Sequence, residues 1–267
     1  MDTDYQQALN AAGPIPDLQG TLRAHNVKLP HEAQQARGVR VLGRMIRSLV
    51  FTTDIAIIRN CDADAVFAVY PFTPQQMISK MLVEASSIPV FVGVGGGTTS
   101  GPRSGMLARD AEAAGAYGVV LNAPASNATL EMVSRVVDIP VVVTVVDDDP
   151  QTVRNRLESG ASIINVAAGK RTPEVVASLR RQFPQLPLFA TGGKTPDTVA
   201  QTVDAGTNAV IVTPPSTSEL FTPLMDRYRD STGSAAPRTG PRPISQAALS
   251  EIEHGLRKLK EDGLILK

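Results

Sequence analysis

An internal repeat constrains the fold of this chain more than any other feature. Three apolar runs begin with an aliphatic residue and a proline, at 88–93, 139–144 and 186–191. A second series of apolar runs alternates with them, at 118–122, 163–166 and 209–213, so that a unit of two runs recurs roughly every fifty residues. Self-similarity at a fixed period indicates that one supersecondary unit is used several times.

Each run is short, nearly continuous and rich in β-branched residues, which is typical of parallel strands that are covered on both faces. Ser48–Thr52 and Ala65–Tyr70 complete a set of eight predicted strands. The alternation predicts an α/β fold, a (β/α)8 TIM barrel, because an open doubly wound sheet would carry a nucleotide fingerprint after its first strand. Amphipathic stretches predict the helices, at 74–85, 106–114, 129–137, 152–157, 172–183, 196–203 and 218–228.

The 267-residue chain divides into four parts by composition. We predict an N-terminal extension at 1–46, the barrel at 47–230 and a linker rich in Ser, Gly, Pro and Thr at 231–243. The last part, 244–267, has apolar residues at helical spacing and predicts an amphipathic helix. This helix docks on the barrel or on a second subunit, or simply caps the chain; its apolar residues are Leu249, Ile252, Leu256 and Leu259.

Charge and composition exclude several classes of partner. Lys and Arg together number 26, Asp and Glu together number 26, and there is no Trp, so a nucleic-acid partner is not expected. No apolar run approaches the roughly 20 residues of a membrane helix, and the polar start does not resemble a signal peptide. Cys61 is the single cysteine, so we expect a cytoplasmic protein without disulfides; a homo-oligomer is left open.

Hydroxyls and glycines follow the last two predicted strands. Thr191, Gly192 and Gly193 follow the seventh strand, and Thr213 and Ser216 follow the eighth. Backbone N–H groups at glycines and at helix N-termini suit phosphate, so we predict a phosphate site there. The alternative is that both loops are merely tight turns.

A long glycine-rich loop follows the third predicted strand. Gly95, Gly96 and Gly97 are followed by hydroxyl residues and by Arg103. Since arginine offers a planar fork to carboxylate or phosphate, the loop is predicted to bind an anionic part of the substrate. A mobile lid and an ordinary solvated loop are the alternatives.

Four residues at predicted strand ends are candidate catalytic groups. Lys170 ends the sixth strand and can act as a Schiff-base amine or stabilise negative charge, unless it is an ordinary surface lysine. Asn122 and Asn165 close apolar runs and can orient a substrate, or can be buried amides bonded to backbone. Asp54 can be a general base, although the cap of a helix is the favoured interpretation.

Carboxylates cluster after the fifth strand, at Asp147–Asp149. Mg²⁺ at Asp147 and Asp148 is conceivable, but adjacent side chains rarely converge on one ion, and Asp before Pro150 is usual at the start of a helix. We therefore expect no required cofactor and no metal site. The three histidines lie outside the repeats, which argues against a histidine metal site and against a Ser-His-Asp triad.

Residues 47 to 229 resemble the ribulose-phosphate-binding barrel superfamily, which includes thiamine phosphate synthases, tryptophan synthase α-like lyases and 2-keto-3-deoxy-6-phosphogluconate aldolases. The repeats carry this resemblance, together with Ala190-Thr191-Gly192-Gly193 and the later Ala205-Gly206-Thr207-Asn208-Ala209. The chain is closer still to a group of bacterial barrel proteins loosely labelled "hydrolase", through 60–66, 93–97 and 213–215.

The resemblance implies that Gly192, Gly193 and Ser216 bind phosphate and that Lys170 lies near the Schiff-base strand of the aldolases. This chain departs from the pattern of those aldolases in two places: Lys170 follows Ala167-Ala168-Gly169, and no glutamate follows the second predicted strand. We expect an enzyme acting on a small phosphorylated carbonyl metabolite, as an aldolase-type lyase, an isomerase or a synthase. A non-catalytic protein that binds a phosphorylated metabolite and a metal-assisted hydrolase are the alternatives.

Overall fold

The computed structural model describes residues 27–230 and 245–261. The chain forms two compact units, one made of residues 25–229 and the other of residues 1–24 and 230–267. The expected linker at 231–243 lies outside the described residues, as does most of the expected N-terminal extension.

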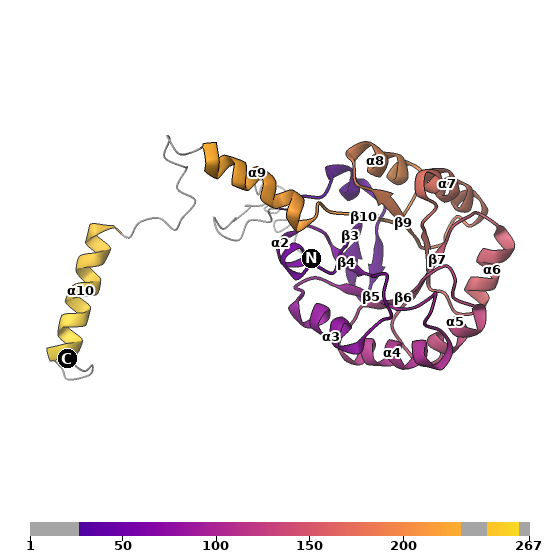
Figure 1. Ribbon diagram of the computed structural model, residues 1–267, viewed down its shortest axis with the longest axis horizontal. Helices are drawn as coiled ribbons and strands as arrows, with labels where there is room; N and C mark the ends of the chain where they lie inside the picture. The colour runs from indigo at the N-terminus through magenta and orange to yellow at the C-terminus, as the bar shows by residue number, and fades with distance from the viewer. Residues whose placement is uncertain (1–26, 231–244, 262–267) are drawn as a thin grey trace, which may run out of the picture. The chain divides into compact units, whose positions relative to one another are not determined.

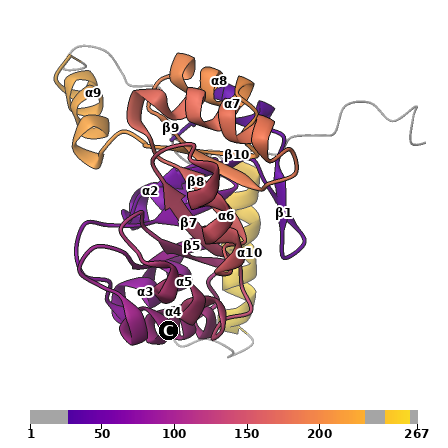
Figure 2. The ribbon, with the colours of Figure 1, turned by 90° about the vertical axis from the view of Figure 1, so that its right-hand side faces the viewer.

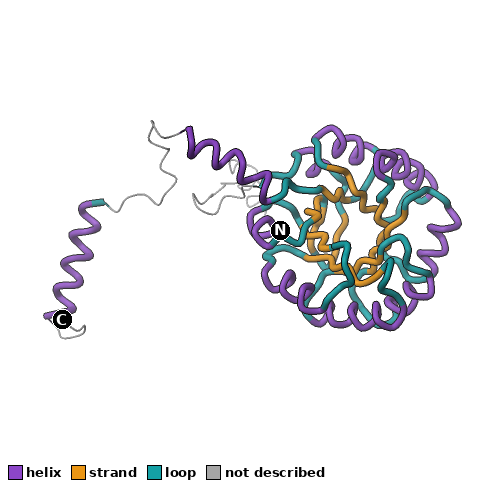
Figure 3. Tube along the Cα trace, viewed as in Figure 1, coloured by secondary structure: helices purple, strands orange, loops and turns teal. Residues whose placement is uncertain are grey.

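Eight parallel strands close into a barrel in the first unit, and helices surround them (Figures 1 and 3). Each strand pairs with the next along the chain, and the last pairs with the first, so the predicted TIM barrel is confirmed. The strands are β3 (Ser48–Phe51), β4 (Ala65–Ala68), β5 (Val90–Gly95), β6 (Gly118–Leu121), β7 (Val141–Val145), β8 (Ile163–Val166), β9 (Leu188–Gly193) and β10 (Ala209–Val212).

The helices follow the strands in the expected order. Each amphipathic stretch forms a helix, whereas the six-residue α2 is too short to show helical periodicity and was indicated only by Asp54 as a helix cap. Gly115, Gly160 and Gly206 have positive φ just after their helices, the left-handed conformation that glycine adopts most easily at a helix end. The helices are α2 (Ile55–Asn60), α3 (Gln76–Ala85), α4 (Gly101–Ala113), α5 (Asn127–Ser134), α6 (Pro150–Glu158), α7 (Thr172–Gln182), α8 (Pro196–Asp204) and α9 (Thr217–Asp230).

Alternation along the strands creates two apolar cores. One set of side chains fills the barrel, where Phe91 and Phe189 meet edge to face with ring centroids 5.5 Å apart. The other set, such as Val92 and Ala190, packs outward in the core shared with the helices. Both faces of each strand are therefore buried, which explains the nearly continuous apolar runs.

A hairpin precedes the barrel and lies at one of its ends (Figure 2). It pairs β1 (Val39–Val41) with β2 (Arg44–Ile46), two strands that the sequence pattern did not predict because each has only three residues. Val41 and Ile46 are buried in the same cluster as the barrel interior. The hairpin therefore closes the end from which the strands start.

A 3-10 turn from the same N-terminal part, η1 (His31–Gln35), covers β10 beside α8. Its Ala33 is fully buried against Val199 of α8 and Val210 of β10. This short segment contributes to the helical layer of the barrel.

Of the second unit the structure describes mainly α10 (Gln246–Glu261), which confirms the predicted terminal helix. Leu249 and Ile252, on its apolar stripe, are exposed. Within residues 27–230 and 245–261, no helix is long and apolar enough to cross a membrane.

Candidate active site

Polar side chains replace the apolar interior where the barrel strands end. Asn165 and Thr144 lie two residues beyond the interior Ile163 and Val142, and Thr191 lies two beyond Phe189, so alternation directs all three inward. Asn165 is only 2% exposed, and its Nδ2 donates to Thr144 Oγ1 over 3.1 Å. Its Oδ1 is buried without a hydrogen-bond partner among the residues that the structure describes.

An unpartnered buried carbonyl oxygen costs roughly 1–3 kcal/mol, which a donor on a ligand would offset. Asn165 was predicted to orient a substrate or to be a satisfied buried amide. The structure leaves one of its two polar atoms without a described partner, and Asn165 is not among the residues that line the three cavities described below.

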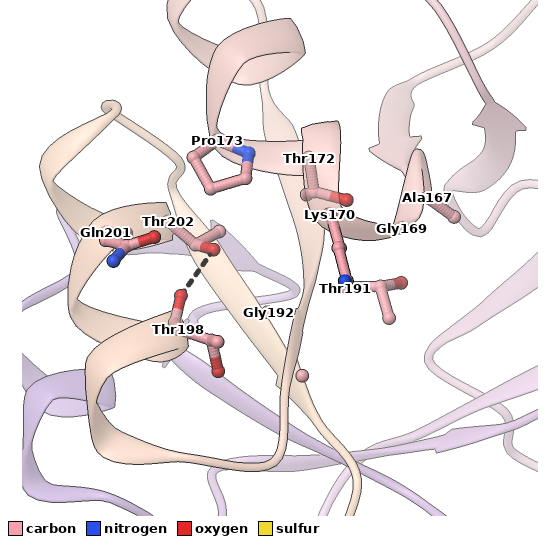
Figure 4. A pocket seen from close by; sticks show the side chains of 11 residues that line it. Ala167, Gly169, Lys170, Thr172, Pro173, Thr191, Gly192, Thr198, Gln201 and Thr202 are labelled. Atoms are coloured by element: carbon pink, nitrogen blue, oxygen red, sulfur yellow. Dashed lines mark hydrogen bonds between the residues drawn. The ribbon is translucent and has the colours of Figure 1, made fainter.

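A cavity of about 430 Å³ opens between the ends of β8 and β9 and the starts of α7 and α8. Figure 4 shows the Lys170 side chain extending toward Thr191, with Thr172 behind it. The opposite wall is one face of α8, where Thr202 Oγ1 donates to the Thr198 carbonyl oxygen over 2.8 Å. The residues that line the cavity provide one cation, Lys170, several hydroxyls and the backbone of Gly192 and Gly193.

Lys170 does not end a strand as the sequence analysis expected. Strand β8 stops at Val166, and Lys170 lies four residues later in the 3-10 turn η2 (Gly169–Arg171). The intervening residues lift its backbone out of the sheet, so the lysine is exposed rather than held among apolar strand residues. It nevertheless lines the cavity.

The residues predicted to bind phosphate line two neighbouring cavities, and the Thr213 N–H of one donates to the Gly193 carbonyl of the other over 3.2 Å. Thr191, Gly192 and Gly193 line the cavity of Lys170. Thr213 and Ser216 line another cavity, of about 300 Å³, between the ends of β10 and β3.

In the second cavity the Ser216 donors already have a partner. Its backbone N–H and its hydroxyl donate to the Glu219 carboxylate, over 2.6 Å and 2.7 Å. These bonds, with the nearby Lys194 charge, lower the pKa of Glu219. An internal carboxylate thus occupies the start of α9, where the sequence placed part of the phosphate site.

Asp54 lines the same cavity and caps a helix, as favoured from the sequence. Its Oδ1 accepts from the backbone N–H of Ala56 and Ile57 at the start of α2, over 2.8 Å and 3.3 Å. Its Oδ2 accepts a hydrogen bond from the Thr217 hydroxyl. The Thr217 hydroxyl is the main cause that lowers the Asp54 pKa, and the helix N–H groups lower it further.

The glycine-rich loop lines a third cavity, of about 220 Å³, at the ends of β4, β5 and β6. Gly95, Gly96, Gly97 and Asn122 contribute to it. Arg103 is exposed on α4 and is not among the lining residues. The structure therefore separates the arginine from the loop with which it was expected to bind an anion.

The three aspartates after β7 diverge. Asp149 caps α6 through the backbone N–H of Gln151 and Thr152, and the Thr152 hydroxyl is the main cause that lowers its pKa. Asp147 accepts from the Asp149 N–H, and Asp148 has its pKa lowered mainly by the Ser178 hydroxyl. Among the residues described, no three His, Cys, Asp or Glu side chains are grouped so that they could hold a metal ion.

Several polar residues near the carboxyl ends of the strands were not predicted from the sequence. Thr198, Gln201 and Thr202 lie on one face of α8, and Thr144 faces the barrel interior. The α8 residues recur at helical spacing, but the same spacing also serves packing on a sheet. A threonine at an inward-facing strand end is the signal that could have identified Thr144.

No family model and no curated protein sequence matches this chain, whereas solved structures do. A phosphonopyruvate hydrolase, crystallised with oxalate and Mg²⁺, is 12% identical with a TM-score of 0.54, over 90% of this chain and 100% of that one. A phosphoenolpyruvate phosphomutase from Streptomyces platensis subsp. rosaceus is 14% identical with a TM-score of 0.55, over 87% and 98%. An oxaloacetate acetylhydrolase is 11% identical with a TM-score of 0.54, over 82% and 93%. These similarities show that the chain shares their barrel fold.

Proposed function

We propose that this protein is an enzyme that acts on a small phosphorylated carbonyl compound at the carboxyl end of the barrel, as a lyase, an isomerase or a synthase. The observation that carries the proposal is the cavity of about 430 Å³, where Lys170 stands beside Thr191, Gly192 and Gly193. Active sites of this fold lie at this end.

We assign to Lys170 the role of binding or stabilising negative charge on the substrate. As an ammonium it offers three donors to a phosphate or to an oxyanion that develops on the carbonyl oxygen. As a neutral amine it can add to the carbonyl carbon and form an imine with loss of water. Asn165 Oδ1 is the acceptor for a hydroxyl or another donor of the same substrate, because this oxygen has no described protein partner.

The proteins with a similar fold support a small anionic substrate. Their names refer to phosphonopyruvate, phosphoenolpyruvate and oxaloacetate. Two of these compounds are small 2-oxo acids, and the third is the enol phosphate of such an acid. One further match, a 2,3-dimethylmalate lyase, is named a member of the PEP mutase/isocitrate lyase superfamily. We infer a relationship to that superfamily, in addition to the likeness to ribulose-phosphate-binding barrels.

Mg²⁺ does not enter the proposed reaction. The phosphonopyruvate hydrolase was crystallised with this ion, but the carboxylates described in this chain are not grouped to hold one. We therefore derive no step through a metal and do not favour a metal-assisted hydrolase.

The proposal is tested by titrating inorganic phosphate calorimetrically and by following phosphorylated sugars and keto acids by NMR for turnover. Replacing Lys170 with Met should weaken phosphate binding about tenfold or more, since a hydrogen bond to a charged group contributes roughly 1.5–3 kcal/mol. Arg171→Met is the matched control, because Arg171 is an exposed cation in the same turn that does not line the cavity.

The Lys170 variant should also lose turnover while the control keeps it. Equal phosphate affinity in both variants would refute the assignment of the cavity. Binding without turnover of any compound would favour the non-catalytic protein that binds a phosphorylated metabolite.

A further inference from the structure

The cavity of about 220 Å³ differs in chemistry from the cavity of Lys170, although both open at the ends of strands. Its floor is made of Gly93, Gly95 and Gly96, and Tyr70 and Phe72 contribute a wall. It lies over β4, β5 and β6, whereas Lys170 follows β8.

The floor carries no side chains. Gly93 is inward-facing, two residues beyond Phe91, and a Cβ there would meet Val69 Cγ2 at 3.4 Å, an ordinary contact. Gly96 has a φ of 105°, and a Cβ there would lie 2.6 Å from Asn122 Cβ. The backbone of the loop is thus held against β6 and presents bare peptide to the cavity, so a flat group can approach it closely.

The wall is an aromatic ring that the protein leaves uncovered. Phe72 is 74% exposed, in a loop between Pro71 and Pro74 whose φ angles are restricted by the rings. The loop is also tied by a hydrogen bond of 2.9 Å from the Gln75 N–H to the Tyr70 hydroxyl. Aromatic rings pack favourably on other planar π-systems, by stacking or edge to face. This restricted loop therefore holds the Phe72 ring beside the glycine backbone that forms the floor of the cavity.

The lining contains no charged residue. Its side-chain polar groups include the Asn122 amide, which makes no hydrogen bond to the other residues that the structure describes. An amide can donate and accept at one edge of a planar ligand. A neutral planar group with a polar edge fits this lining.

We propose that this cavity is a subsite for a neutral planar ring that bears an amide-like edge, with Phe72 against the ring and Asn122 at the edge. The subsite stands on its own geometry. Its role as the second part of the active site, which would make the substrate a phosphorylated carbonyl compound that carries or meets such a ring, rests on the proposed function.

The test compares two probes of the same polar group, benzamide and cyclohexanecarboxamide, whose rings are flat and puckered. Ligand-observed NMR titration at millimolar concentration should show benzamide binding about two- to tenfold more tightly, because only the flat ring can pack face or edge against the Phe72 ring. Equal binding of both probes, or no binding of benzamide, would overturn the proposal.

Variants locate the binding. Phe72→Leu should weaken benzamide binding severalfold, and Gly93→Ala should do the same by placing a methyl group on the floor without a close contact. Phe221→Leu is the matched control, because Phe221 is another exposed phenylalanine, 57% exposed, on α9. An unchanged benzamide affinity in the Phe72 variant would contradict the subsite.

Failure of the subsite and failure of the proposed function can be told apart. Lys170→Met should leave benzamide affinity unchanged while it weakens phosphate binding. Loss of phosphate binding at Lys170 with no benzamide effect in the Phe72 variant keeps the first proposal and removes the second. The reverse result keeps the planar subsite alone.

Discussion

At the end from which the strands start, Asn208 uses its whole amide: its Oδ1 accepts from the Leu188 N–H over 3.0 Å and from Arg180 over 2.7 Å, and its Nδ2 donates to the Gly38 carbonyl over 3.0 Å. At the opposite end, Asn165 is more deeply buried and leaves its Oδ1 without a described partner. The same residue type is fully bonded where the barrel is closed and only half bonded where it opens.

Other residues add to the closure of the end from which the strands start. Asp64 Oδ2, near the closed end, accepts from the N–H of Arg47 over 2.8 Å and from that of Ser48 over 3.0 Å, and the hairpin buries Ile46. The open end instead holds the cavities described above, which are lined by glycines, hydroxyls and Lys170. In this fold one end provides stability and the other end provides binding, and unsatisfied polar groups are the cost at the binding end.

The largest effect is expected from Ile46→Ala at the closed end. This side chain is fully buried, so its truncation should lower the free energy of unfolding by about 2–5 kcal/mol and leave phosphate binding unchanged. Urea denaturation measures the first quantity, and calorimetry measures the second. Leu42→Ala is the control, because Leu42 is 60% exposed at the turn of the hairpin. A similar loss of unfolding free energy in both variants would show that burial of Ile46 is not what stabilises the closed end.

Asn208→Ala should cost about 1–3 kcal/mol, because the Leu188 N–H and Arg180 lose their acceptor. Asn208→Asp keeps an acceptor for both donors and serves as the matched variant. Denaturant unfolding should rank the alanine variant lower. If the two variants were equally stable, the hydrogen bonds to Oδ1 would not be what stabilises this end.

Asp54→Ala tests a well-bonded carboxylate at the open end. Loss of a helix cap should cost about 1 kcal/mol at pH 7. The folded-state pKa of Asp54 is below its ordinary value of 3.8, so the wild-type carboxylate stabilises the protein above that value. This stability is lost as the pH falls through the folded-state pKa.

The Asp54→Ala variant should accordingly lose less stability than the wild type on acidification below about pH 4. Thermal unfolding from pH 7 to pH 3 measures this difference, and Asp54→Asn, which retains a capping oxygen, is the control. Parallel curves for the wild type and the alanine variant would show that the carboxylate is not coupled to folding.

Replacing both members of the Asn165–Thr144 pair should change stability by less than about 1 kcal/mol, in either direction. The double variant Thr144→Val/Asn165→Leu removes both partners together with the unsatisfied Oδ1, and apolar replacement of both partners can be nearly neutral. Turnover should be lost. A destabilisation as large as that of Asn208→Ala would mean that the open end is built for stability as well.

Glu219→Gln should have the smallest effect. It removes the negative charge at Ser216, in the cavity that lacks Lys170. If phosphate binds beside Lys170, its dissociation constant should change by less than about twofold, since helix-terminus charges contribute only about 0.3–1 kcal/mol even at short range. Clearly tighter phosphate binding, measured by calorimetry at pH 7, would move the phosphate site to Ser216.

The sequence by itself determined the barrel, its eight strands and most of the surrounding helices, because strands buried on both faces must be continuous apolar runs and the repeat counts them. It also identified Asp54 as a helix cap and placed Lys170, Gly192 and Gly193 near the carboxyl ends of strands, although Gly192 and Gly193 belong to β9 itself and Lys170 lies beyond the end of β8. These features depend on neighbours along the chain, and such neighbours are visible in a sequence.

Tertiary structure alone decided which of these residues share a cavity. It assigned Ser216 and Gly193 to neighbouring cavities and left Arg103 outside the lining of the glycine-loop cavity, and it joined Lys170 to the face of α8 that carries Thr198. It also placed the three-residue strands of the hairpin across the end of the barrel. The reason is physical: the lining of a cavity depends on the direction of each loop and on the lengths of adjacent strands, and contacts between distant segments set both.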